Sequence, residues 1–105
     1  VMGANMQPQG HMQTLVRMLD YGQNPQAACD APRWRYNAGL EINVEASLNA
    51  DTAQGLQARG HQVGVINDSY QDFGAGQFIW RAGDPKVEGY VVASDARRDG
   101  LAAGF

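Results

Sequence analysis

Few side chains in this 105-residue sequence could bind a metal ion. The chain has two histidines, His11 and His61, and one cysteine, Cys29. The three lie far apart in the sequence and no carboxylates cluster beside them, whereas a zinc site needs three or four Cys, His or carboxylate ligands. The sequence therefore predicts no metal site and no cofactor.

No side chain has the sequence context of an activated nucleophile. The serines are Ser47, Ser69 and Ser94, and none lies in a Gly-x-Ser-x-Gly elbow. Cys29 belongs to an alanine-rich segment, where a small, buried and inert role is typical, and a single cysteine excludes an intrachain disulfide. Gly74-Ala75-Gly76 lacks the lysine of a phosphate-binding loop, so we interpret it as the entry to a strand. Composition and spacing alone show no active site.

The charge distribution argues against nucleic acid and acidic membrane surfaces as partners. The formal net charge is -3, and the eight Lys and Arg residues are scattered rather than clustered. Phe78, Trp80 and Tyr90 are therefore expected to be core aromatics rather than a platform for stacking bases. No segment approaches the roughly 20 apolar residues that cross a bilayer.

Three helices are expected to position these residues, at 10–21, 25–31 and 50–59. The first has apolar residues at the spacing of one buried helix face, namely Met12, Leu15, Val16 and Leu19. Its opposite face carries Gln13, Arg17 and Asp20. Asn24 and Asn49 are the expected N-caps of the other two helices, and Gly22 and Gly60 are the expected stop signals.

Four strands are expected, at 41–45, 62–66, 76–81 and 87–93, which makes the fold class α+β. The last two form a hairpin with apolar residues on both faces, which is typical of a sheet covered on both sides. Few residues remain in this chain to cover them, so we expect residues 1–105 to be a single partial domain. The tail after Ser94 is expected to form a turn held by local Arg–Asp pairs.

Several short motifs occur in an order and spacing that resemble a known enzyme family. They are Val1-Met2-Gly3-Ala4, Met6-Gln7-Pro8-Gln9-Gly10-His11, Asp20-Tyr21-Gly22-Gln23-Asn24-Pro25, Asp30-Ala31-Pro32-Arg33-Trp34, Gly60-His61-Gln62-Val63, Ala93-Ser94-Asp95-Ala96-Arg97-Arg98-Asp99-Gly100 and Ala102-Ala103-Gly104-Phe105. With them, essentially the whole chain resembles the C-terminal part of the small subunit of gamma-glutamyltransferases. The abrupt apolar start at Val1 adds the expectation that the chain was cut from something longer.

The resemblance implies part of an N-terminal nucleophile hydrolase fold, in which two antiparallel sheets are stacked between helix layers (αββα). Precursors of this family cut themselves into a large and a small subunit. The new N-terminal Thr of the small subunit then attacks a gamma-glutamyl amide such as that of glutathione, with a free α-amino group as base. Thr14 and Thr52 are internal, so the nucleophile would lie upstream of Val1 and this chain would hold no catalytic residue.

The resemblance also implies partners for the chain. These are the remainder of the small subunit, the large subunit and a gamma-glutamyl small molecule, while an oligomer is left open. Bacterial members are often periplasmic, and the sequence leaves a periplasmic or a cytoplasmic location open.

One site implied by the resemblance falls within the chain. The family's oxyanion hole uses backbone N–H groups of a glycine pair in a loop before a helix. Gly3-Ala4 is the nearest match, with Ala in place of the second glycine, and Ala keeps this donor if its φ stays negative. Asn5 is the alternative second donor. Gly3, Ala4 and Asn5 are therefore the candidate oxyanion-hole and substrate-binding residues, although a simple tight turn would explain the same residues.

Two other interpretations remain open. One is a related amide acylase, which substrate-binding residues upstream would distinguish. The other is a self-standing domain with a structural or interaction role and no catalysis. A self-standing domain predicts a closed core, whereas a piece of an enzyme predicts exposed apolar surface when the chain is alone.

Overall fold

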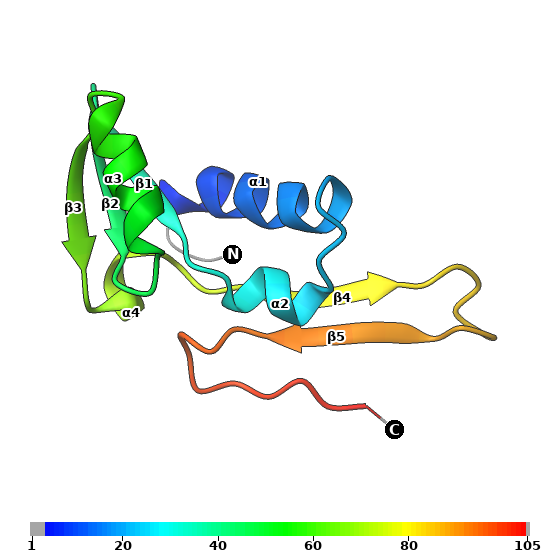
Figure 1. The fold of residues 1–105 in the computed structure, drawn as a ribbon. Coiled ribbons are helices and arrows are strands. Elements are labelled where there is room, and N and C mark those ends of the chain that lie inside the picture. Colours follow the sequence, from blue (N-terminus) through cyan, green and yellow to red (C-terminus); the bar gives the residue numbers. More distant parts are fainter. Residues whose placement is uncertain (1–3, 105) are drawn as a thin grey trace.

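Two small sheets and four helices make up the described part of the chain. The computed structural model describes residues 4–104, apart from the side chain of Gln71. One sheet has three strands in the order β1-β2-β3 and the other pairs β4 with β5 (Figure 1). The elements are α1 Met6–Leu19, α2 Pro25–Asp30, β1 Trp34–Ala38, β2 Glu41–Glu45, α3 Ala50–Ala58, β3 Gln62–Ile66, α4 Ser69–Asp72, β4 Gln77–Arg81 and β5 Tyr90–Ser94.

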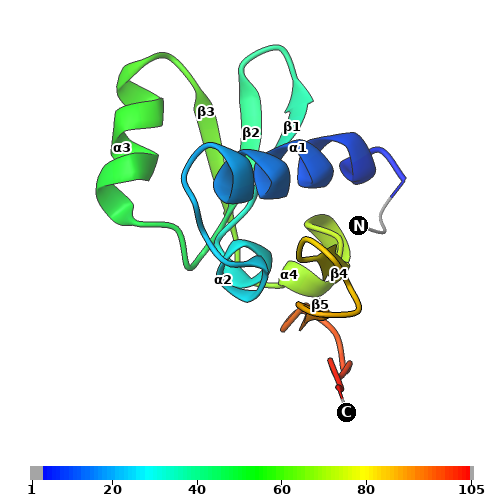
Figure 2. The same ribbon diagram turned by 90° about the vertical axis from the view of Figure 1, so that its right-hand side faces the viewer.

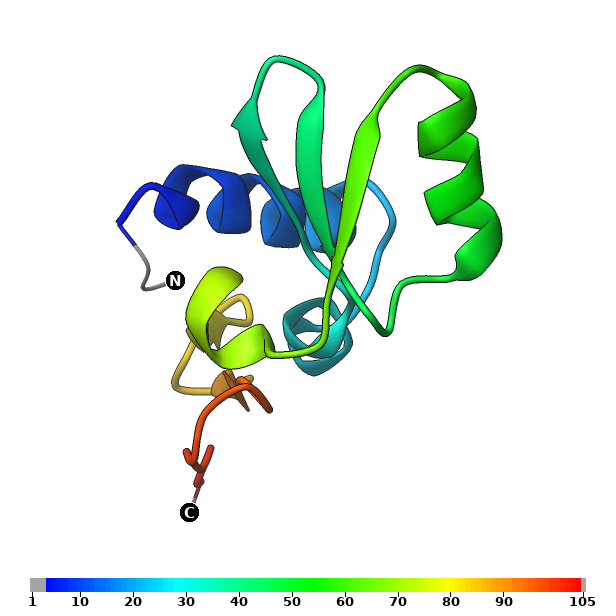
Figure 3. The same ribbon diagram turned by 90° about the vertical axis from the view of Figure 1, so that its left-hand side faces the viewer.

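The three-stranded sheet combines both kinds of strand pairing. β1 and β2 are antiparallel neighbours, whereas β2 and β3 are parallel and are joined through α3. A parallel pair needs such a crossover because the chain must return to the same end of the sheet. Figures 2 and 3 show α3 beside β3 and α1 on the β1 side of the sheet.

The second sheet is a long hairpin that projects away from the first (Figure 1). α2 packs against β5, and the C-terminal tail runs back along the hairpin. In the antiparallel register, Phe78 pairs with Ala93 and Ile79 pairs with Val92. Because paired residues share a face, these two pairs lie on opposite faces of the hairpin.

The structure confirms the three expected helices and corrects the start of the first. α1 begins at Met6 rather than at residue 10, because Pro8 lies in the first turn, where backbone N–H groups have no intrahelical partner and a proline costs little. Asn24 accepts a hydrogen bond from the N–H of Ala27 at 2.8 Å and caps α2 as expected. Gly22 has the expected positive φ, 66°.

The expected strands at 41–45 and 62–66 are confirmed, and that at 76–81 is shorter by one residue. The predicted start of the last strand was wrong, because β5 begins at Tyr90 rather than at residue 87. The N–H groups of Val87 and Glu88 both donate to the carbonyl of Asp84, so these residues form a turn. Two elements, β1 and α4, were not predicted, because neither has a regular apolar pattern.

The expected orientation of α1 was wrong. Gln13 is 7% exposed, whereas Met12, Leu15 and Leu19 are 46%, 49% and 64% exposed. The buried face of α1 is the one that carries Gln13, because its polar groups bond to the edge of β1, and the apolar face is left uncovered within this chain.

Candidate functional site

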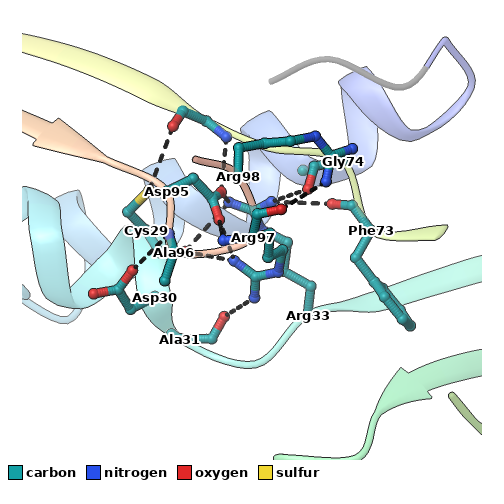
Figure 4. Close-up of polar contacts among 12 residues, drawn as sticks. Cys29, Asp30, Ala31, Arg33, Phe73, Gly74, Asp95, Ala96, Arg97 and Arg98 are labelled. Atoms are coloured by element: carbon teal, nitrogen blue, oxygen red, sulfur yellow. Dashed lines mark hydrogen bonds and ion pairs between the residues drawn. The ribbon is translucent and has the colours of Figure 1, made fainter. Parts of the chain in front are cut away.

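A cluster of two arginines and two carboxylates is buried where the two sheets meet. Asp95 accepts a hydrogen bond from the Arg33 guanidinium at 2.7 Å and another from Arg97 at 3.0 Å. Glu45 accepts from Nε of Arg97 at 2.6 Å and from the backbone N–H of Arg33 at 2.7 Å. The side chains of Arg33 and Asp95 are 2% and 0% exposed. Figure 4 shows Arg33 meeting Asp95 and Arg97, which come from a segment far away in the sequence.

Other guanidinium donors of the cluster bond to backbone carbonyls, whereas the buried Nε of Arg33 has no hydrogen-bond partner among the described residues. Arg33 donates to the carbonyls of Phe73 at 3.0 Å and Gly74 at 3.2 Å. Arg97 donates to the carbonyls of Cys29 and Ala31, each at 2.9 Å. The cluster therefore fixes the end of α2 and the loop before β4, so its role is structural.

The cluster stays ionised at neutral pH. Burial alone would raise the pKa of Asp95, but hydrogen bonds from the N–H groups of Gly76 and Arg97 and the charges of Arg33 and Arg97 lower it overall. Burial would likewise raise the pKa of Glu45, but hydrogen bonds from Arg97, Ser69 and the backbone of Arg33 lower it. Carboxylates with lowered pKa values are poor proton donors near pH 7.

Cys29 is an inert thiol, as the sequence predicted. Its residue is 0% exposed, and its Sγ donates a weak hydrogen bond to the carbonyl of Gly76 at 3.7 Å. Burial, followed by the nearby Asp95 carboxylate, raises its pKa to about 12. A thiol that ionises only near that pH is not a nucleophile at neutral pH.

The turn that precedes α1 contains two of the three candidate oxyanion-hole residues. Ala4 and Asn5 are exposed, and Gly3 lies outside the described residues. Ala4 has a φ of 45°, so the condition under which Ala would keep the donor, a negative φ, is not met. This left-handed conformation costs an alanine about 1–2 kcal/mol. The Ala4 carbonyl accepts a hydrogen bond from the N–H of Gln7 at 3.0 Å, and this bond closes the turn.

Hollows of the described surface show no further catalytic grouping. An open hollow of about 350 Å³ lies between α1 and β1 and is lined by residues such as Met12, Arg17 and Trp34. Among the described residues, no group of three or more His, Cys, Asp or Glu could hold a metal ion. None of the described helices combines the length and the apolar character needed to cross a membrane.

Sequence reasoning missed the long-range partners in the buried cluster. The local pair of Asp95 with Arg97 was expected from the tail and is present. Arg33 and Glu45 had no such signal, because they lie 62 and 52 residues away from the tail residues that they pair with, Asp95 and Arg97. The bonds from α1 to β1 were also missed, although Gln9, Gln13 and Arg17 recur at intervals of four residues.

Comparison with known proteins decides the family. The model of the gamma-glutamyltranspeptidase family matches residues 1–105. The chain belongs to the gamma-glutamyltranspeptidase family. It is 36% identical to the glutathione hydrolase-like YwrD proenzyme of Bacillus subtilis (strain 168), over 98% of this chain and 20% of that protein. It is 33% identical to the glutathione hydrolase proenzyme of Escherichia coli (strain K12), over 90% of this chain and 15% of that protein.

Solved structures agree with this gamma-glutamyltranspeptidase assignment. The crystal structure of a cephalosporin acylase from Bacillus halodurans superposes with a TM-score of 0.88 and 43% identity, over 100% of this chain and 19% of that one. The transpeptidase CapD of Bacillus anthracis superposes with a TM-score of 0.74 and 20% identity, over 93% of this chain and 57% of that one, which shows the shared fold. The expected α+β class and the N-terminal nucleophile hydrolase fold are confirmed. The chain spans at most a fifth of the length of the curated relatives it matches.

Proposed function

We propose that this chain is the C-terminal part of the small subunit of an enzyme that hydrolyses or transfers gamma-glutamyl groups of glutathione-like amides. The observation that carries the proposal is the match of the gamma-glutamyltranspeptidase model to residues 1–105. The nucleophile in this proposal is an N-terminal Thr upstream of Val1, made by self-cleavage of a precursor. The chain's partners would be the remainder of the small subunit and the large subunit.

In this proposal, the chain's own contribution to catalysis is the turn Gly3-Ala4-Asn5. The backbone N–H groups of Gly3 and of Asn5, the alternative second donor, would stabilise the oxyanion that forms when the Thr attacks the amide, an effect worth a few kcal/mol per donor. Ala4 is left out because its φ of 45° does not meet the condition of a negative φ. The exposure of Ala4 and Asn5 at the start of α1 supports this role, since the partial positive charge of a helix lies at its N-terminus.

A second candidate is an acylase that removes an acyl group from a cephalosporin-type amide. The observation in its favour is the 43% identity to the Bacillus halodurans cephalosporin acylase, which exceeds the identity to either glutathione hydrolase relative. The two candidates share the nucleophile and the oxyanion-hole turn, and differ only in the acyl group bound by residues upstream.

The full-length precursor that contains this chain tests both candidates. Self-cleavage is measured by intact mass and N-terminal sequencing, and activity by kcat/KM for a gamma-glutamyl anilide and for an acyl-cephalosporin amide. We expect a new N-terminal Thr and faster turnover of the gamma-glutamyl amide. Faster turnover of the cephalosporin amide would favour the acylase instead.

A matched pair of substitutions separates the nucleophile from other threonines. Replacing the new N-terminal Thr by Ala should abolish self-cleavage and turnover, whereas Thr52→Ala on the exposed side of α3 should change neither. A natural protein that begins at Val1, shows no self-cleavage and turns over neither amide would overturn the enzyme proposal and leave the non-catalytic domain.

A further inference from the structure

α1 presents a row of three polar side chains to the free edge of β1. Gln9 accepts from the N–H of Tyr36 at 2.6 Å and donates to its carbonyl at 3.4 Å. Gln13 accepts from the N–H of Trp34 at 3.0 Å and donates to its carbonyl at 2.8 Å. Arg17 continues the row by donating to the carbonyl of Pro32 at 3.1 Å.

The spacing of this row follows from the rise of the two elements. Four residues of a helix rise by about 6 Å, and two residues of a strand by about 6.7 Å, so every fourth helix residue can reach every second strand residue. In an antiparallel pair, alternate residues turn their N–H and C=O groups away from the partner strand. On β1 these are Trp34 and Tyr36, so the glutamine amides take the place of a neighbouring strand and cover an edge that would otherwise be open.

Gln9 also reaches the turn that precedes α1. Its Nε2 donates to the carbonyl of Asn5 at 3.4 Å as well as to that of Tyr36. Asn5 makes no side-chain capping bond of its own to α1. The amide of Gln9 therefore joins the turn to the sheet, while Gln13 and Arg17 fix the rest of the helix.

We propose that Gln9 is a positioning residue, which holds the oxyanion-hole turn at a fixed place by clamping the first turns of α1 to the edge of β1. This inference rests on the proposed function. An oxyanion hole acts on charge that develops in the transition state, so a displaced turn lowers kcat and leaves ground-state binding largely unchanged.

The kinetic test compares two glutamines in the full-length precursor. Gln9→Met keeps the length and the helix propensity of the side chain but removes its hydrogen bonds. Gln54→Met on the exposed side of α3 is the matched control. We expect Gln9→Met to lower kcat by about tenfold to a hundredfold, the size of effect seen when a reacting group is misplaced by about 1 Å. KM should stay within about threefold, and the control should match the wild type in both.

Hydrogen exchange provides a second test that does not depend on activity. Amides of residues 5–7 should exchange faster in Gln9→Met than in the wild type and in Gln54→Met, because the turn loses its connection to β1. This measurement separates failure of the proposed function from failure of the inference. A wild-type precursor that turns over no amide would overturn the function, and the exchange rates would still decide whether Gln9 holds the turn.

Two results would overturn the inference. One is a kcat for Gln9→Met equal to that of Gln54→Met in an active enzyme. The other is unchanged exchange at residues 5–7, which would show that the turn keeps its place without Gln9.

Discussion

Asp95 is the residue on which the buried cluster depends most. It accepts from Arg33, from Arg97 and from the N–H of Gly76, and the last of these bonds is 2.7 Å long. Two arginines thus share one carboxylate in a region from which water is largely excluded. A charge left unpaired in such a place is far more costly than the loss of a pair on the surface.

We therefore expect Asp95→Asn to lower the free energy of unfolding by about 3–5 kcal/mol, the usual cost of breaking a buried pair. The control is Asp72→Asn, which removes the partner of Arg35 in a pair whose side chains are 34% and 30% exposed. That change should cost about 1 kcal/mol or less. Urea unfolding of both variants in the same protein measures the difference, and similar losses would contradict a special role for Asp95.

The lowered pKa values of Asp95 and Glu45 fix the direction of the pH dependence. A carboxylate whose pKa is lower in the folded state stabilises the fold above its unfolded pKa of about 4, and this contribution is lost as pH falls through the folded value. From these groups we expect no change in stability between pH 7 and about 5, and a steep loss below about pH 4.

Asp95→Asn should make the loss of stability below about pH 4 less steep, because it removes one of the two carboxylates that cause it. Asp20→Asn, at an exposed position after α1, is the control and should lose stability with falling pH as the wild type does. Unfolding free energies measured at a series of pH values test this prediction. An equally steep decrease below pH 4 in Asp95→Asn would argue that other groups cause the loss of stability in acid.

At the scale of elements, α1 shows that the polar face of a helix is not always the face exposed to solvent. Gln13 is 7% exposed, and it satisfies both backbone groups of Trp34 that face away from β2. A buried backbone group without a partner costs about 1–3 kcal/mol. The hydrogen bonds, rather than apolar contact, thus select the face that α1 turns to the sheet.

Gln13→Met should accordingly destabilise the protein by about 2–4 kcal/mol, because it leaves both backbone groups of Trp34 without their partner. Gln54→Met makes the same chemical change on an exposed surface and should cost less than about 0.5 kcal/mol. Thermal or urea unfolding of the two variants checks the contrast. Equal stability of the two would mean that water replaces the amide at β1.

Local signals explain which elements could be predicted from the sequence. Asn24 and Asn49 mark their helix starts because capping is a contact within one turn, and β2 and β3 follow from their apolar residues. β1 has no comparable pattern, since residues 36–38 are exposed and its edge bonds come from a helix more than 20 residues away. The cluster of Arg33 and Asp95 depends in the same way on contacts that only the folded chain creates.

At the scale of the whole molecule, two apolar surfaces stand out as uncovered among residues 4–104. One is the face of α1 with Leu15 and Leu19, and the other is the hairpin, where Ile79 is 77% and Tyr90 is 59% exposed. Exposed apolar side chains in neighbouring positions commonly mark contact surfaces. Because the chain spans 20% of its Bacillus subtilis relative, our proposal places the rest of a precursor against them.

The proposal predicts that one substitution has different effects in the chain alone and in the full-length protein. In the chain alone, Ile79→Asp should lower the binding of a hydrophobic dye and leave the far-UV circular dichroism unchanged, because Ile79 faces solvent there. In the full-length protein, the same change should lower the free energy of unfolding by about 2 kcal/mol or more, because it would bury a charge against the remainder of the precursor.

Lys86→Asp in the hairpin turn, where the side chain is exposed, should have little effect in either setting. A compact chain that binds no dye, together with a full-length protein that tolerates Ile79→Asp, would instead support a self-standing domain, since the hairpin face would then remain in solvent.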